Sequence, residues 1–115
     1  MTRPADIYFR FLQLADALRG LPALPALDPL EQRILELVAR VGQTHERLSV
    51  RDIMGKSELG SPATLHARLT SMREKGWIRL GDTEDARRKQ VELTPAALRY
   101  FDKLSEAMVR AAKDQ

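Results

Sequence analysis

The stretch "EKGWIRLGDTEDARRKQVELTP", residues 74–95, decides the fold. Two short runs in it, "WIRLG" (77–81) and "KQVELT" (89–94), contain the β-branched and aromatic residues that are typical of strands. The octet between them, "DTEDARRK" (82–89), holds three acids and three bases. The pattern therefore predicts a β-hairpin that carries a dense cluster of charge at its tip.

A pair of short helices is expected directly before this hairpin. Ser61 is a suitable N-cap for a helix that runs over about 62–75, and Gly76 suits the position after its last turn. An earlier helix over about 50–57 would be capped by Ser49. Two short helices separated by a tight turn form a helix-turn-helix. The side chains expected in its core are Ile53, Met54, Leu65, Leu69 and Met72.

Further upstream, "DPLEQRILELVARVG" predicts a helix with a capping box. Asp28 would be the N-cap, Glu31 would complete the box, and Gly42 would end the helix. One face of this helix is apolar. A very short strand is possible at "ERLSV", residues 46–50. The expected buried face of the helix consists of Leu30, Ile34, Leu37, Val38 and Val41.

Helices are also expected at both ends of the chain. The first covers residues 4–19, and "GLPALPAL" (20–27), with two prolines, connects it stiffly to the next helix. The last helix starts at Thr94 and Pro95. One of its faces would be lined by Leu98, Phe101, Leu104 or Ser105, and Met108.

This order of elements is that of a winged helix, a helix-turn-helix followed by a β-hairpin. At 115 residues and 13.0 kDa, one domain is expected over 1–115. Its fold class would be mainly α with a small β-hairpin. The domain would consist of an N-terminal dimerisation helix (1–20), a winged helix-turn-helix (28–94) and a C-terminal helix (95–115).

Composition limits the classes of function. The chain has no cysteine, no apolar run of membrane-spanning length and no pattern of a secretory signal, so we expect a cytoplasmic protein. It also lacks a Gly-rich phosphate loop, and its two histidines lie in different elements, so we expect no enzyme, no metal and no cofactor. Residues 61–90 contain seven Lys and Arg against four Asp and Glu, so the net charge of +3 is concentrated there. Such a patch suits a polyanion.

From Asp28 to about Tyr100 the chain resembles the MarR family of bacterial winged-helix transcription regulators. The resemblance rests on residues 74–95. There Lys75 and Gly76 close the recognition helix, Asp85 and Arg87 match the Asp-x-Arg wing tip, and Leu93-Thr94-Pro95 open the next helix. The resemblance implies a double-stranded DNA-binding regulator in which the wing tip reaches the backbone and minor groove. A charged, solvated turn is the plain alternative for the octet.

The resemblance also assigns candidate DNA-binding residues. The recognition helix, about 61–75, would enter the major groove, and the wing, about 77–94, would lie on the backbone. Arg68 is expected to point outward and to prefer guanine, whereas His66 is as easily a solvated surface residue. The full set is Ser61, Ala63, Thr64, His66, Arg68, Arg79, Asp85, Arg87, Arg88 and Lys89.

We further expect a homodimer that represses by covering a promoter. The N-terminal helix carries more apolar residues than one face can bury on a small domain, which favours a partner copy. The alternative is that this helix merely closes the core of a monomer. A small-molecule effector is doubtful, because little helix follows Tyr100. The expected interface consists of Ile7, Tyr8, Phe11, Leu12, Leu14, Phe101, Leu104 and Met108.

A function of a different class stays open. A winged helix can also serve as a protein-interaction module, such as an adaptor or antagonist of another regulator, with weak or no DNA binding. The two readings differ in salt dependence, because phosphate contacts release counterions and contacts with a protein need not.

Overall fold

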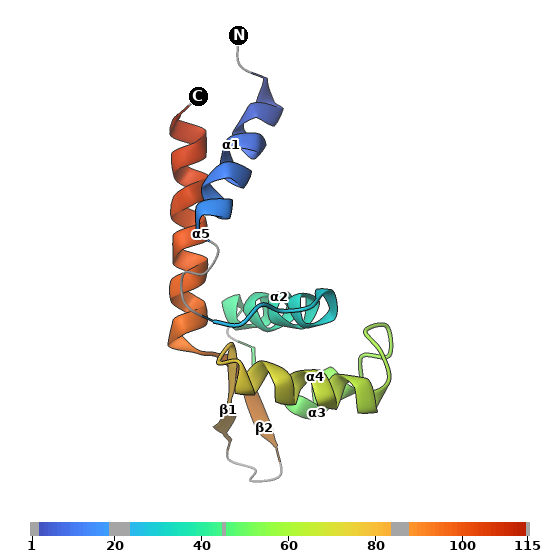
Figure 1. Ribbon diagram of the computed structural model, residues 1–115. Coiled ribbons are helices and arrows are strands. Elements are labelled where there is room, and N and C mark those ends of the chain that lie inside the picture. Colours follow the sequence, from blue (N-terminus) through green and yellow to red (C-terminus); the bar gives the residue numbers. More distant parts are fainter. Residues whose placement is uncertain (1–2, 19–23, 45, 84–87, 115) are drawn as a thin grey trace. The chain divides into compact units, whose positions relative to one another are not determined.

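The computed structural model of the chain describes residues 3–18, 24–44, 46–83 and 88–114. The chain divides into two compact units, which are shown in Figure 1. The central unit is Pro25–Thr94, and the terminal unit combines Met1–Leu24 with Pro95–Gln115. The fold is mainly helical with a two-stranded antiparallel hairpin, which confirms the predicted fold class.

In the central unit, helix α2 (Pro29–Gln43) has the predicted capping box. Asp28 Oδ1 accepts a hydrogen bond from the backbone N–H of Glu31 at 2.7 Å, and Glu31 Oε1 accepts one from that of Asp28 at 2.9 Å. The predicted end at Gly42 is wrong. The helix continues through Gln43 and is capped by Thr44, whose Oγ1 donates to the carbonyl of Val41 at 2.8 Å.

The helix-turn-helix consists of α3 (Val50–Met54) and α4 (Pro62–Glu74). Ser49 caps α3 as expected, since its Oγ accepts from Asp52 N–H at 3.0 Å. The helix is three residues shorter than predicted, and Met54 is only half-buried. The possible strand at 46–50 reduces to an isolated bridge between Ser49 and Gln90.

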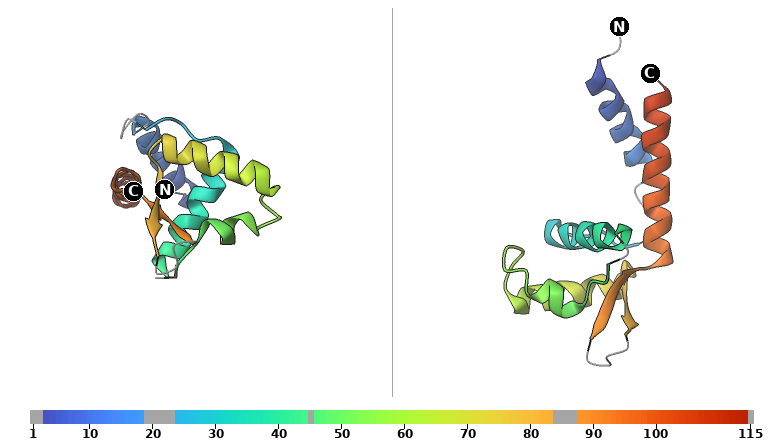
Figure 2. Two further views of the ribbon diagram at one scale, coloured as in Figure 1. Left: turned by 90° about the horizontal axis from the view of Figure 1, so that it is seen from below. Right: turned by 180° about the vertical axis from the view of Figure 1, so that it is seen from behind.

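The hairpin pairs β1 (Ile78–Asp82) with β2 (Lys89–Leu93) in the predicted place. Its register runs from Ile78 opposite Leu93 to Asp82 opposite Lys89. Figures 1 and 2 show the hairpin projecting beside α4 from the helices of the central unit. Gly76 joins α4 to β1 with a φ of 85°, a conformation that glycine adopts without strain.

The core of the central unit lies between its three helices and the inner face of the hairpin. Its side chains come from α2, α3, α4, both strands and the segments that connect them, so packing holds the hairpin to the helices. Leu65, Leu69 and Met72 are buried as predicted. The buried apolar residues are Ile34, Leu35, Val38, Leu48, Ile53, Leu65, Leu69, Met72, Trp77, Ile78 and Val91.

The terminal unit consists of α1 (Pro4–Ala17) and α5 (Pro95–Lys113), which lie side by side in Figure 2. Arg10 Nε forms an ion pair with Asp114 Oδ2 at 2.8 Å between the two chain ends. None of the residues of α1 is fully buried. Of the connector predicted at 20–27, residues 20–23 lie outside the described part of the chain. Among the described residues, none of the helices is long and apolar enough to span a membrane.

The apolar face predicted for α5 is not the face that the helix buries completely. Leu98 and Met108, two residues of the predicted face, are 50% and 53% exposed. Phe101 and Leu104 are half-buried. Small side chains form the fully buried positions instead, and these are Ala97, Ala107 and Ala111.

Candidate nucleic-acid interface

Helix α4 begins with a tight N-terminal cap. Ser61 Oγ accepts a hydrogen bond from Thr64 N–H at 3.2 Å and donates one to Thr64 Oγ1 at 2.9 Å. Pro62 occupies the first turn, where its missing N–H has no intrahelical partner to lose. The cap therefore presents a well-ordered helix start, with both side chains exposed.

Exposure divides α4 into an apolar inner face and a polar outer face. Ala63 and Thr64, in the first turn, are exposed, as is His66 in the second. Sequence reasoning missed Thr70 and Arg73, which are exposed as well. Thr70 lies four residues after His66 and Arg73 seven residues after it, which puts all three on the same helical face. This spacing was the signal that could have found them.

Arg68 is placed differently from the expectation. It lies at the edge of the outer face, half-buried, with Nε 3.0 Å from Asp28 Oδ2. The geometry is that of an ion pair without an aligned hydrogen bond, since Arg68 Nε makes none within the described residues. Asp28 thus caps α2 with one carboxylate oxygen and faces Arg68 with the other.

In the hairpin, two candidate cations face acids on the neighbouring strand. Arg79 Nε is 3.0 Å from Glu92 Oε2, and Lys89 forms an ion pair with Asp82. Both pairs are cross-strand neighbours in the register. Their carboxylates reduce the net positive charge that the strands offer to a polyanion.

Of the turn that joins the two strands, the structure describes only the flanking residues Thr83 and Arg88. Asp85 and Arg87, the proposed Asp-x-Arg wing tip, lie outside the described residues. Arg88 is exposed, and its backbone carbonyl accepts a hydrogen bond from Thr83 Oγ1 at 2.7 Å.

The pKa of Asp52, in α3, lies below its ordinary value, chiefly because the backbone N–H and hydroxyl of Ser49 bind its carboxylate, with a smaller contribution from Arg88.

A polar groove of about 500 Å³ lies between the second half of α4 and β1. Two arginines line it together with one carboxylate, and guanidinium groups suit a phosphate group better than an apolar ligand. The hydroxyl of Thr70 already donates to the carbonyl of His66 at 3.1 Å. The groove joins the outer face of α4 to the hairpin. Its lining residues are Thr70, Arg73, Glu74, Ile78, Arg79 and Leu80.

The terminal unit leaves several apolar side chains in contact with solvent. Tyr8 and Leu12 of the expected dimer interface are 58% and 44% exposed. Ile7 and Met108 are exposed too, whereas the other four predicted members are half-buried and pack within the unit. Exposed apolar residues that the prediction did not include are Phe9, Leu98 and Val109.

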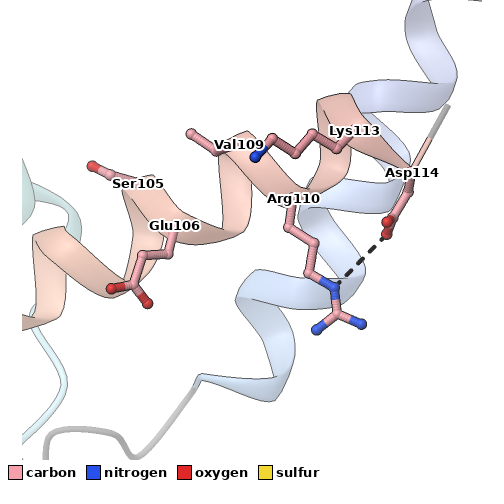
Figure 3. Close-up of a pocket in the computed structure, with 6 residues that line it drawn as sticks. All are labelled: Ser105, Glu106, Val109, Arg110, Lys113 and Asp114. Carbon is pink, nitrogen blue, oxygen red and sulfur yellow. Dashed lines mark ion pairs between the residues drawn. The ribbon is translucent and has the colours of Figure 1, made fainter.

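Figure 3 shows a hollow along the last turns of α5. Its volume is about 530 Å³, and four of the six residues that line it are charged. Arg110 Nε lies 3.9 Å from Asp114 Oδ2, four residues further along the chain. The residues that line it are Ser105, Glu106, Val109, Arg110, Lys113 and Asp114.

No family model and no curated protein matches this sequence. Solved structures do. A structure of S. aureus MepR bound to ethidium bromide superposes with a TM-score of 0.66 at 19% identity, over 94% of this chain and 74% of that chain. MepR is a MarR-family regulator. The chain has the winged-helix fold of the MarR-type regulators.

Two further structures share this MarR-type fold. The crystal structure of a MepR–DNA complex matches with a TM-score of 0.64 at 20% identity, covering 94% of this chain and 76% of that chain. The YusO protein from Bacillus subtilis matches with a TM-score of 0.55 at 17% identity, covering 94% and 69%. The MarR-family neighbours are transcription regulators and not enzymes.

Proposed function

We propose that the chain is a sequence-specific double-stranded DNA-binding regulator of transcription. The observation that carries the proposal is the outer face of α4, which stands exposed beside the hairpin in a winged-helix fold. MepR, with the same fold, has been solved in complex with DNA. The chain would act in the cytoplasm of a bacterium, where DNA is accessible.

In this proposal α4 enters the major groove with its N-terminus first. Small side chains at Ala63 and Ala67 allow close approach of the helix, and His66 and Thr70 offer hydrogen-bonding groups to base edges. Ser61 and Thr64 lie at the helix start, where backbone N–H groups favour a phosphate. Arg68 would contact a guanine only after leaving Asp28.

The hairpin would act as the wing on the neighbouring backbone and minor groove. Arg73 and Arg79 line the groove between α4 and β1, where a phosphate would be held between helix and wing. Beyond them the tip would supply a guanidinium to the minor groove, whose negative potential attracts arginine. The wing residues of the proposal are Arg79, Asp85, Arg87, Arg88 and Lys89.

We further propose that two copies pair through the terminal unit and repress by covering a promoter. Exposed Ile7, Tyr8, Leu12 and Met108 support this, since an apolar surface of this kind favours a partner. A two-fold pair would place two α4 helices about 34 Å apart, one turn of B-DNA. MepR, which has the same fold, has been solved with ethidium bromide. Whether this chain also binds a small-molecule effector is a separate question from DNA binding.

One observation favours the alternative, a protein-interaction module. Arg79 and Lys89 face Glu92 and Asp82, so the basic side chains of the two described strands are each paired with an acid. Selection of bound fragments from a random duplex library, followed by a salt titration on the selected duplex, decides between the two. A palindromic consensus with a steep salt dependence supports the regulator. The regulator is refuted if no sequence is selected and the affinity for duplex DNA does not change with salt concentration.

A further inference from the structure

The corner at which α4 ends and β1 begins is held by several specific bonds. Trp77 N–H donates to the carbonyl of Met72 at 3.0 Å, and Thr94 Oγ1 donates to that of Gly76 at 2.6 Å. The corner joins the two elements that we propose contact DNA. Its conformation therefore sets the angle between the recognition helix and the wing.

A partly buried ion pair ties this corner to the start of α2. Lys75 Nζ lies 2.8 Å from Glu31 Oε1 and donates to the carbonyl of Ala26 at 3.0 Å. Trp77 Nε1 donates to the carbonyl of Pro25 at 2.8 Å. The residues on both sides of Gly76 thus bind the segment that leads into α2.

Stability alone does not account for this pair. Glu31 is 1% exposed, and among the described residues it is the only charged side chain that is buried. Removing Glu31 and most of Lys75 from water costs about as much free energy as their attraction returns, so a well-packed neutral pair is usually as stable. Burial acts to raise the pKa of Glu31, but hydrogen bonds from Asp28 N–H and Lys75 outweigh it and hold that pKa below its ordinary value. Glu31 is therefore ionised at neutral pH.

We infer that Glu31 and Lys75 are positioning residues, which fix the corner between α4 and the hairpin and thereby sharpen discrimination between DNA sequences. The inference rests on the proposed function. Base contacts require placement to within about half an ångström, whereas contacts to phosphates tolerate more movement. Loosening the corner should consequently impair recognition of the preferred sequence and leave general binding intact.

The test is the double variant Glu31→Gln/Lys75→Met in the full chain. Gln retains the capping box, and Met retains most of the volume of the lysine stem. The net charge is unchanged, so the salt dependence of DNA binding can be compared directly. We expect an equal or higher melting temperature, about tenfold weaker binding to the selected duplex, and unchanged binding to a random duplex of equal length.

Two more variants complete the design. Trp77→Phe keeps an aromatic ring and removes the hydrogen bond to Pro25, so it should cause a smaller loss of the same kind. The matched control is Lys103→Met/Glu106→Gln, the same chemical change at an exposed pair 3.4 Å apart on α5. The control should alter binding to neither duplex.

Three results would overturn the inference. Unchanged affinity for the selected duplex would mean that the pair is merely structural. An equal loss on both duplexes, with a salt slope lower by about one, would make Lys75 a phosphate contact. If the unaltered chain bound no duplex at all, the proposed function would fail, and this inference with it.

Discussion

Replacing Tyr8 with Asp tests the proposed pairing of two copies. Tyr8 is 58% exposed, so the substitution leaves the packing between α1 and α5 largely intact. Phe11, in contrast, is half-buried within the unit, and a charge there would also damage the single chain. An effect of Tyr8→Asp on self-association would therefore report on the contact between copies.

The expected magnitude follows from the exposed area. A tyrosine side chain buries about 200 Å² when it is covered, and 58% of that remains exposed in the single chain. At about 25 cal/mol per Å², covering this remainder contributes about 3 kcal/mol. A two-fold interface contains the residue twice, so about 6 kcal/mol is at stake, and the dimer dissociation constant should rise by about four orders of magnitude.

Sedimentation velocity over a concentration series measures the dissociation constant directly. The matched control is Gln13→Asp, which makes the same change of charge at an exposed position of the same helix. We expect dimers for the unaltered chain and the control, and monomers for Tyr8→Asp with greatly reduced affinity for a palindrome. Equal dimerisation of all three, or monomers throughout, would show that this surface is not the interface.

Four further results are expected. Arg87→Ala should weaken binding to every duplex and lower the salt slope by about one, which a salt titration measures; an unchanged slope contradicts the wing assignment. Arg68→Ala should cost about 1–3 kcal/mol on the preferred duplex and relax one position per half-site; uniform loss in repeated selection would indicate a phosphate contact. Met72→Ala should lower the free energy of unfolding by about 2–5 kcal/mol in urea, because Met72 is fully buried; a loss below that range contradicts its place in the core. The lowered pKa of Glu31 should stabilise the folded chain above pH 4.5, its ordinary pKa, and this contribution should be lost as the pH falls below that value. Urea titrations at several pH values measure it. If Glu31→Gln lost as much stability on acidification as the unaltered chain, the expectation would be contradicted.

Sequence patterns predicted the local structure well where one residue decides it. The capping box of Asp28 and Glu31, the N-cap at Ser61 and the place of Gly76 directly after the end of α4 were all expected and are all present. The wrong end at Gly42 arose because a glycine can end a helix but need not, and here Thr44 caps the helix two residues later.

Periodicity was less reliable where two faces of a helix are both apolar. In α5 it predicted an apolar face lined by large side chains, among them Leu98 and Met108, whereas the positions that the helix buries completely include Ala107 and Ala111. Small residues permit closer approach of a neighbouring helix, and hydrophobic spacing does not distinguish them from the larger ones. Which of the two faces packs in the chain, and which is left exposed, depends on tertiary contacts.

The ion pairs between elements far apart in the chain could not be predicted from the sequence. Nothing in the spacing shows that Arg68 faces Asp28, 40 positions earlier in the chain, or that Lys75 faces Glu31. Such pairs form between elements that only the folded chain brings together. The cross-strand pair Arg79–Glu92 was in principle accessible, because the hairpin register follows once both strands are assigned.

These pairs explain why acids accompany the bases of the proposed interface. An exposed ion pair is worth about 1 kcal/mol or less, so a DNA phosphate can displace Glu92 from the exposed Arg79 at small cost. Yet that cost offsets part of each phosphate contact, which lowers affinity for DNA of any sequence. Base contacts by the outer face of α4 and the pairing of two copies would then supply most of the preference for one site. A bare basic surface would bind DNA more tightly and distinguish sequences less well.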